Sequence, residues 1–260
     1  MLAHLSRRRR LAGGIAASLE AILLLVALLA LRAQTPELRR ESGFVPVVLV
    51  HGYGGTSESM SVLAQRLRTA GREVVSVDLP DNGEDHILVS ARALSKAVER
   101  TGARKFDFVG FSAGGVVVRA YLEDLNGARF ARHVVLLAAP NHGTEVAAVA
   151  ASTAAELCTG ACADLVPGSS FLDRLNAGDE TAVGPDYTTV WTSRDETVTP
   201  PSSATLQGAV NVRLQDVCPG SSAGHGELVT DPTALALVLK ALDGRLHSVP
   251  DAARCRSPRF

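Results

Sequence analysis

The stretch DFVGFSAGGVVVRAY, residues 107–121, contains a serine whose surroundings would suit a nucleophile. An apolar run leads to Gly110, Ser112 follows in the pattern Gly-x-Ser-x-Gly, and a second apolar run begins after Gly115. A tight turn between a strand and a helix would hold this serine in a strained backbone and present its hydroxyl to a substrate. The alternative is a plain glycine-rich turn, because so short a pattern also arises by chance.

A serine hydroxyl needs a general base, and the base needs a carboxylate that orients it. The segment SSAGHGE offers His225 between two glycines, and WTSRDETVTP offers two neighbouring acids. We favour Asp195 as the orienting acid because it comes first after an apolar run and has the shorter side chain. Glu196 and Asp216 are the alternatives.

An oxyanion formed at the serine would need two backbone N–H donors. The residue after the nucleophile supplies one in this arrangement, which is Ala113, and a loop after the first buried strand supplies the other. That loop is HGYGG, residues 51–55, and Tyr53 is the candidate. His51 is expected to brace the loop rather than to react.

Alternating apolar segments predict the elements that carry these residues. Buried strands are expected at 45–52, 72–80, 105–111, 132–140, 187–193 and 209–217, and helices at 57–70, 87–100, 116–125 and 233–242. The alternation predicts an α/β domain with a mostly parallel central sheet of about six strands and helices on both faces. Residues 141–186 interrupt it, and we expect them to form a lid or a substrate wall with a helical piece at 145–157.

The N-terminal segment predicts export. Four arginines at 7–10 precede a stretch from Leu11 to Leu31 that is apolar except for Glu20. We interpret residues 1–33 as a signal peptide, or alternatively as a retained membrane anchor, so that the protein is secreted or extracytoplasmic. Residues 34–44 would be a linker, 45–245 the folded domain and 246–260 a tail.

The four cysteines fit an oxidising compartment. An even count in an exported chain indicates two disulfides. Among three pairings we favour the two local ones, Cys158 with Cys162 and Cys218 with Cys255. A zinc site is the weaker alternative because no histidine stands at finger-like spacing.

The charge pattern argues against nucleic-acid binding. The formal net charge is −1, and the basic residues are dispersed apart from the N-terminal cluster.

Six segments together resemble the small secreted bacterial triacylglycerol lipases of the lipase class 2 type, within the α/β-hydrolase superfamily. They are VVLVHGYGG, VGFSAGG, APNHGTE, PGSSFLDRLN, SRDETVTP and GHGEL, and the likeness spans about residues 45–242. The resemblance implies an α/β-hydrolase fold and cofactor-free hydrolysis of carboxylic esters through an acyl-enzyme on Ser112. The longer insertion at 141–186 and the four cysteines depart from the smallest members.

The resemblance leaves three activities to compare. In a lipase or esterase, acyl chains would lie against Phe171, Leu172 and the alanine-rich segment. An acyltransferase would use the same Ser112, Asp195 and His225 but pass the acyl group to another alcohol, and a non-catalytic binding module is the third reading. We expect a monomer that takes a lipid or another carboxylic ester, with contact at a membrane or lipid interface as a further expectation.

Overall fold

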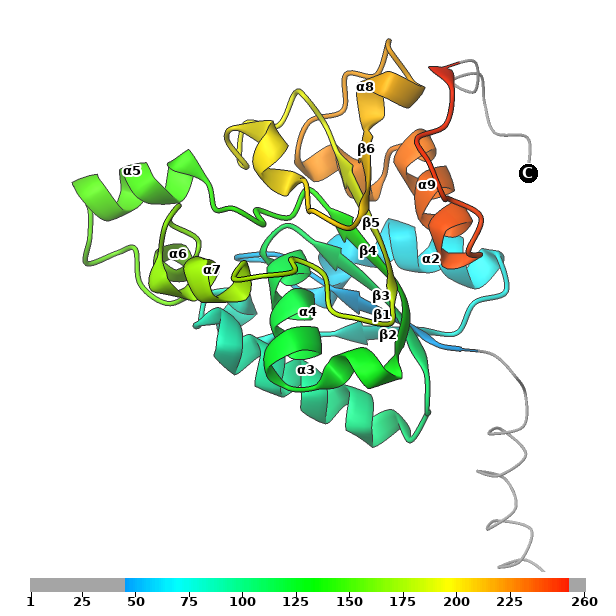
Figure 1. Ribbon diagram of the computed structural model, residues 1–260, viewed down its shortest axis with the longest axis horizontal. Coiled ribbons are helices and arrows are strands. Elements are labelled where there is room, and N and C mark those ends of the chain that lie inside the picture. Colours follow the sequence, from blue (N-terminus) through cyan, green and yellow to red (C-terminus); the bar gives the residue numbers. More distant parts are fainter. Residues whose placement is uncertain (1–44, 253–260) are drawn as a thin grey trace, which may run out of the picture. The chain divides into compact units, whose positions relative to one another are not determined.

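The computed structural model describes residues 45–252 of the 260-residue chain (Figure 1). The expected signal peptide or anchor, the linker and the last part of the tail, with Cys255, lie outside the described residues. Within 45–252 no helix is both long enough and apolar enough to cross a bilayer.

A six-stranded parallel sheet forms the centre of the domain, in the order β2-β1-β3-β4-β5-β6. Every neighbouring pair of strands is parallel, so the predicted α/β architecture is confirmed. The strands are β1 (Val47–Val50), β2 (Val74–Val77), β3 (Phe106–Phe111), β4 (Ala131–Leu137), β5 (Asp186–Trp191) and β6 (Val210–Arg213).

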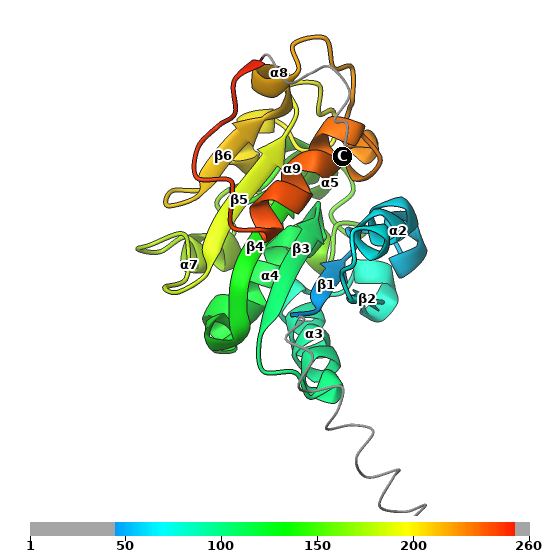
Figure 2. The same cartoon turned by 90° about the vertical axis from the view of Figure 1, so that its right-hand side faces the viewer.

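Helices cover both faces of this sheet (Figures 1 and 2). In β1, Val48 and Val50 face the core beneath α3 and α4, whereas Val47 and Leu49 face the core beneath α2 and α9. Successive strand residues point to opposite faces, so a strand buried on both sides reads as a continuous apolar run. The covering helices are α2 (Ser61–Thr69), α3 (Ile87–Thr101), α4 (Ala113–Asp124) and α9 (Pro232–Leu242).

Several predicted boundaries were wrong. The α-helix expected from residue 57 begins at Ser61, and the helical piece expected at 145–157 ends at Thr153. Helix α4 begins at Ala113, directly after the serine, and not at residue 116. The strand expected to reach residue 217 ends at Arg213, and Leu214–Val217 forms the short helix α8. Leu214 and Val217 are both buried three residues apart, which is helical spacing, while Asp216 between them is exposed.

Residues 141–185 contain three short helices and, among these described residues, no strand: α5 (Glu145–Thr153), α6 (Ala161–Asp164) and α7 (Ser170–Leu175). They lie together at the left in Figure 1. Thr144 caps α5 by accepting the Val146 N–H at 3.3 Å, and Ser169 caps α7 by accepting the Leu172 N–H at 3.2 Å. Single-turn 3-10 helices complete the fold at Ser57–Met60, Pro80–Gly83, Gly127–Phe130, Pro201–Ala204 and Gly226–Val229.

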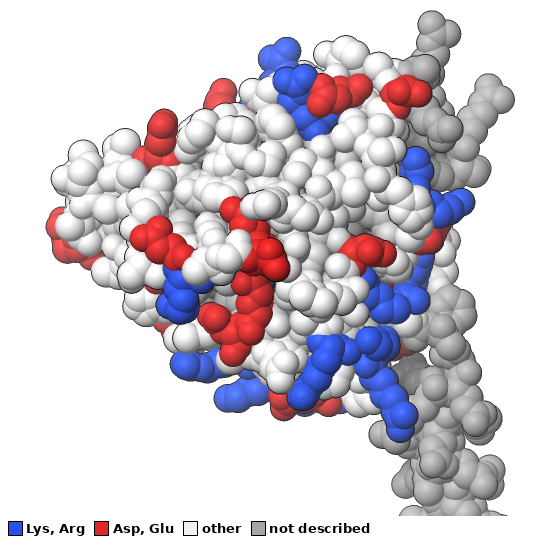
Figure 3. Space-filling view, viewed as in Figure 1, with Lys and Arg blue, Asp and Glu red and all other residues white. Residues whose placement is uncertain are grey.

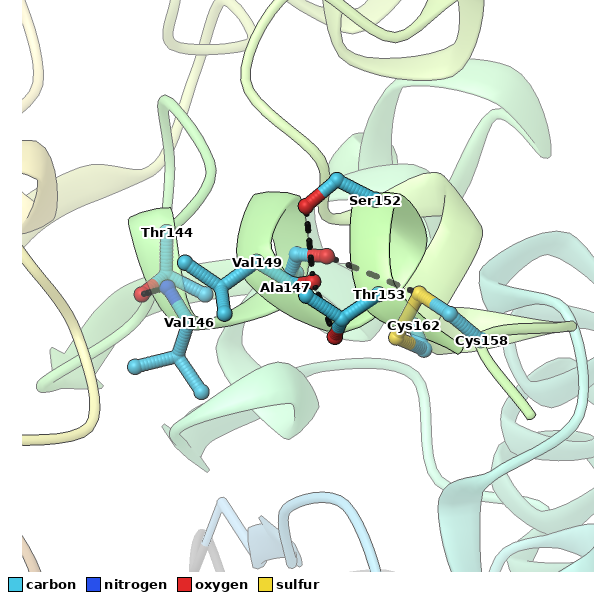
Figure 4. The surroundings of a disulfide bond; sticks show 8 residues. All are labelled: Thr144, Val146, Ala147, Val149, Ser152, Thr153, Cys158 and Cys162. Atoms are coloured by element: carbon cyan, nitrogen blue, oxygen red, sulfur yellow. Dashed lines mark hydrogen bonds between the residues drawn. A yellow bond between two sulfur atoms is a disulfide. The ribbon is translucent and has the colours of Figure 1, made fainter. Parts of the chain in front are cut away.

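A disulfide joins Cys158 to Cys162 between α5 and α6 (Figure 4), as predicted. The Cys158 sulfur also lies 3.7 Å from the Ala147 carbonyl oxygen of α5, so the crosslink packs directly on that helix. Cys218 is disulfide-bonded as well, and its expected partner Cys255 lies outside the described residues.

Two buried carboxylates have shifted pKa values. Burial would raise the pKa of Asp107 on β3, but hydrogen bonds from His133 and Arg132 outweigh it and hold the pKa below its usual value. Burial raises the pKa of Glu123 on α4 to about 7, against the opposing charge of Arg119, whose nitrogen lies 3.6 Å away. Folding therefore favours the charged form of the first carboxyl and the neutral form of the second.

Candidate active site

Ser112 lies at the turn between β3 and α4, in a backbone conformation that few side-chain-bearing residues adopt. Its φ and ψ are 55° and −133°, which lie outside the regions favoured for L-residues. The glycines around it permit close packing: a β-carbon at Gly114 would lie 2.2 Å from the His51 carbonyl oxygen, and one at Gly110 would lie 2.5 Å from the Gly115 α-carbon. The turn predicted from the sequence is therefore present, and it places the serine hydroxyl at the N-terminus of α4.

The loop after β1 passes directly over this serine. A β-carbon at Gly52 would lie 2.7 Å from the Ser112 β-carbon and 3.2 Å from its Oγ. His51 fixes the loop: its Nε2 accepts the Leu79 N–H at 3.0 Å, so the proton is on Nδ1, which donates to the Gly52 carbonyl at 2.9 Å. The ring is buried and braces the loop, as expected from the sequence.

His225 connects the serine to an acid. Its Nε2 lies 3.0 Å from Ser112 Oγ, and its Nδ1 lies 2.8 Å from Asp195 Oδ2. A carboxylate can only accept, so Nδ1 donates to Asp195 and Nε2 is free to accept the serine hydroxyl proton. The Phe111 ring stands 5.0 Å from the imidazole, centroid to centroid, and limits its movement.

The structure brings Asp195 to His225, and it brings neither of the alternative acids there. Asp195 is 6% exposed, and its Oδ1 accepts the N–H groups of Thr197 and Val198 at 2.9 and 2.7 Å. These two bonds leave Oδ2 for the histidine. Glu196 is exposed, and Asp216 is paired with Arg213 on the surface.

The predicted oxyanion donors flank the same turn. Ala113 is the first residue of α4, where helix N–H groups have no partner within the helix. Tyr53 follows Gly52 in the loop over Ser112; its side chain is 46% exposed, and burial with a hydrogen bond from the hydroxyl to Glu84 raises the tyrosine pKa. Both positions suit the predicted role, which stays a prediction.

The predicted substrate contacts Phe171 and Leu172 are not on an open surface. They are 7% and 2% exposed and pack in the apolar core with residues of α4. The exposed aliphatic side chains on and just after α5 are instead Val146, Val149 and Leu157, at 48%, 59% and 75%. Most of the surface at the left of Figure 3, around α5, carries neither acidic nor basic side chains.

A polar depression of about 800 Å³ lies beside the histidine loop. Its lining includes Arg194, Glu196, His225 and Glu227 but not Ser112, so it lies beside His225 rather than over Ser112. Within the described residues, no group of three His, Cys, Asp or Glu side chains is arranged to hold a metal ion.

Sequence reasoning missed the residues that hold the reactive groups in place. His225 is contacted by the Phe111 ring, and Asp195 accepts the Thr197 and Val198 amides. The hydroxyl of Thr192 binds the Ala223 carbonyl in the loop that carries the histidine. A backbone amide has no sequence signature, and threonine is common in loops. Phe111 stands beside the serine in the sequence, but no pattern there indicates a ring contact with a histidine 114 residues away.

Solved structures of two lipases and a phospholipase superpose on this chain. Aspergillus fumigatus lipase B superposes with a TM-score of 0.69 at 20% identity, over 84% of this chain and 56% of that one. The chain thus spans little more than half of that lipase. Bacillus licheniformis lipase BlEst2 in its mature form gives 0.58 at 19% identity, over 77% and 91%, and Legionella pneumophila phospholipase PlaB gives 0.55 at 18% identity, over 77% and 59%.

A family model matches residues 46–178, which is half of the sequence, and its description is palmitoyl protein thioesterase. The match includes Ser112 and its turn and ends before Asp195 and His225. The expected superfamily is confirmed. The chain belongs to the palmitoyl protein thioesterase family, among the α/β-hydrolases of the lipase and esterase type.

Proposed function

We propose that this protein is a serine hydrolase that cleaves acyl esters through an acyl-enzyme on Ser112. The observation that carries the proposal is the pair of contacts at His225, 3.0 Å to Ser112 Oγ and 2.8 Å to Asp195 Oδ2. The order serine, acid, histidine along the chain is the order used by α/β-hydrolases.

The chemistry follows from these contacts. Ser112 Oγ attacks the carbonyl carbon while its proton passes to His225 Nε2, and Asp195 stabilises the imidazolium that forms. The N–H groups of Ala113 and Tyr53 would bind the oxyanion. His225 then gives its proton to the leaving alcohol, and a water molecule, deprotonated by the same nitrogen, releases the carboxylic acid and restores the serine.

The substrate class is proposed as a long-chain acyl ester, or a thioester of the same acyl group. Support comes from the family described as palmitoyl protein thioesterase and from the exposed aliphatic side chains Val146, Val149 and Leu157 on and just after α5. In a thioester the leaving group is a thiol, whose low pKa makes it leave readily, so the same residues suffice. Export of the protein from the cell stays part of the proposal, on the strength of the arginine-led apolar segment at its N-terminus.

The full-length chain should hydrolyse p-nitrophenyl esters from acetate to palmitate, and the Ser112→Ala variant should lose this activity by at least about 10³-fold. A palmitoyl thioester assayed beside the oxygen esters will rank the two leaving groups. Unchanged turnover in Ser112→Ala would exclude the mechanism, whereas a wild-type preference for acetate would exclude only the long-chain substrate.

A further inference from the structure

We propose that Thr192 is a positioning residue that joins the acid loop to the histidine loop and thereby sets the geometry of the Asp195–His225 pair. The inference rests on the function proposed above. Thr192 follows β5 directly, stands three residues before Asp195 and has no exposed surface.

The hydroxyl of Thr192 contacts both loops at once. It donates to the carbonyl oxygen of Ala223 at 2.7 Å, two residues before His225. It accepts the Arg194 N–H at 3.2 Å and the Gln215 side-chain amide at 2.9 Å. A hydroxyl has one proton to donate and two lone pairs, so all of its capacity is used here.

Gln215 on α8 also links the loop that carries Asp195 to the loop that carries His225. Its Oε1 accepts the Ser193 N–H at 3.0 Å, and its Nε2 lies 3.4 Å from the Ser221 carbonyl oxygen as well as binding Thr192. Arg194 adds a contact from its Nε to the same Ser221 oxygen at 3.3 Å. Two side chains, Thr192 and Gln215, therefore bind backbone groups on both sides of the acid–base pair.

This arrangement affects chemistry because Asp195 and His225 come from separate loops. Their 2.8 Å contact requires the two loops to keep a fixed separation. Loss of the Thr192 hydroxyl leaves the Ala223 carbonyl and the Arg194 N–H without this partner and leaves the Gln215 amide with only the longer contact to Ser221, so the histidine loop is then free to shift. A displacement of about 1 Å in a catalytic group costs on the order of a hundredfold in rate.

The test is Thr192→Val, which keeps the side-chain shape and removes the hydroxyl. We expect kcat for a p-nitrophenyl ester to fall about ten- to a hundredfold with little change in KM. Weaker stabilisation of the imidazolium by Asp195 should also move the acid limb of the kcat/KM profile to lower pH. Thr192→Ser restores the hydroxyl and should recover most of the activity and the wild-type profile.

Thr189→Val is the matched control. Thr189 lies on β5, the strand that Thr192 follows, is equally buried, and donates its hydroxyl to Asn211 Oδ1 at 2.8 Å, away from the site. It should lower stability comparably without moving the pH profile. Equal kinetics in the two valine variants, or no recovery in Thr192→Ser, would overturn the proposal.

A readout without turnover separates this inference from the proposed function. Hydrogen exchange should be faster at the amides of residues 221–228 in Thr192→Val than in Thr189→Val. If the wild-type protein hydrolyses no ester while this difference appears, the function is wrong and the link between loops stands. If Ser112→Ala abolishes activity while Thr192→Val exchanges and turns over like the control, only the positioning role is wrong.

Discussion

Gly52 packs so closely against Ser112 that it has no room for a β-carbon. A β-carbon on Gly52 would lie 2.7 Å from the Ser112 β-carbon, below any ordinary separation of two carbon atoms. The loop after β1, which should supply an oxyanion donor, therefore packs tightly against Ser112. A change in either one displaces the other.

Gly52→Ala should lower kcat/KM by on the order of a hundredfold, because either the loop or the serine must move. Ester hydrolysis and a urea unfolding curve measure the two consequences. Gly220→Ala is the control, since a β-carbon there meets nothing within 4 Å. An active Gly52→Ala enzyme would mean that the loop moves away without affecting the oxyanion donors.

Asp195→Asn should reduce kcat by about 10⁴-fold, because an amide that donates to the histidine favours the wrong tautomer. Glu196→Gln is the neighbouring control: Glu196 is exposed, so we expect near-wild-type rates. Steady-state kinetics of the two variants with one ester decide between them. If Glu196→Gln is the more damaging change, the acid is misassigned.

Glu123→Gln should change how stability depends on pH. The pKa of Glu123 is raised to about 7 from 4.5. The contribution of the neutral Glu123 to the stability of the fold is therefore fully present below pH 4.5 and is lost as the pH rises through 7. Glutamine does not titrate. On going from pH 5 to pH 8, the free energy of unfolding of the variant should therefore rise by on the order of 2–3 kcal/mol relative to that of the wild type. Urea unfolding at pH 5 and at pH 8 tests this expectation. The control is Glu156→Gln, because Glu156 is exposed.

The same experiment distinguishes two environments for Glu123. A stability difference that does not depend on pH would mean that Arg119 keeps the carboxylate charged in the folded state, despite its burial.

Replacing both Cys158 and Cys162 by serine should loosen α5 locally. The disulfide closes a short loop, for which the entropic contribution to stability is only about 2 kcal/mol. We expect faster proteolysis near Leu157, which is 75% exposed, and a loss of no more than about 2 kcal/mol in the free energy of unfolding of the whole domain. Mass spectrometry of the fragments locates the cut, and cleavage elsewhere first would contradict the expectation.

The sequence predicted those features that depend on a single property of each residue, such as whether its side chain is apolar. Buried parallel strands are continuous apolar runs, so the sheet and its helices could be predicted, and the reactive residues follow because each stands just beyond a predicted strand. The local disulfide followed from cysteine spacing. Boundaries were harder: α4 begins with three small residues of low apolar signal, Ala113, Gly114 and Gly115, whose helix depends on packing against β1 and β4.

What could not be predicted depends on contacts between distant segments. Phe171 was expected to lie against the acyl chain of the substrate, but the packing of α7 against the core buries it. Thr192 carries no sign in the sequence that its hydroxyl reaches Ala223, since only the pairing of two loops creates that bond.

The glycine packing of α4 also determines which parts of the site can move. A β-carbon at Gly114 would lie 2.2 Å from His51 O, and one at Gly115 would lie 2.5 Å from the Ala139 β-carbon, so this helix cannot slide along the sheet without a clash. Ser112, at the N-terminus of this helix, is therefore held in place relative to β1 and β4. We expect any widening for a bulky acyl chain to come from residues 141–185, which makes their three short helices the natural place to engineer chain-length preference.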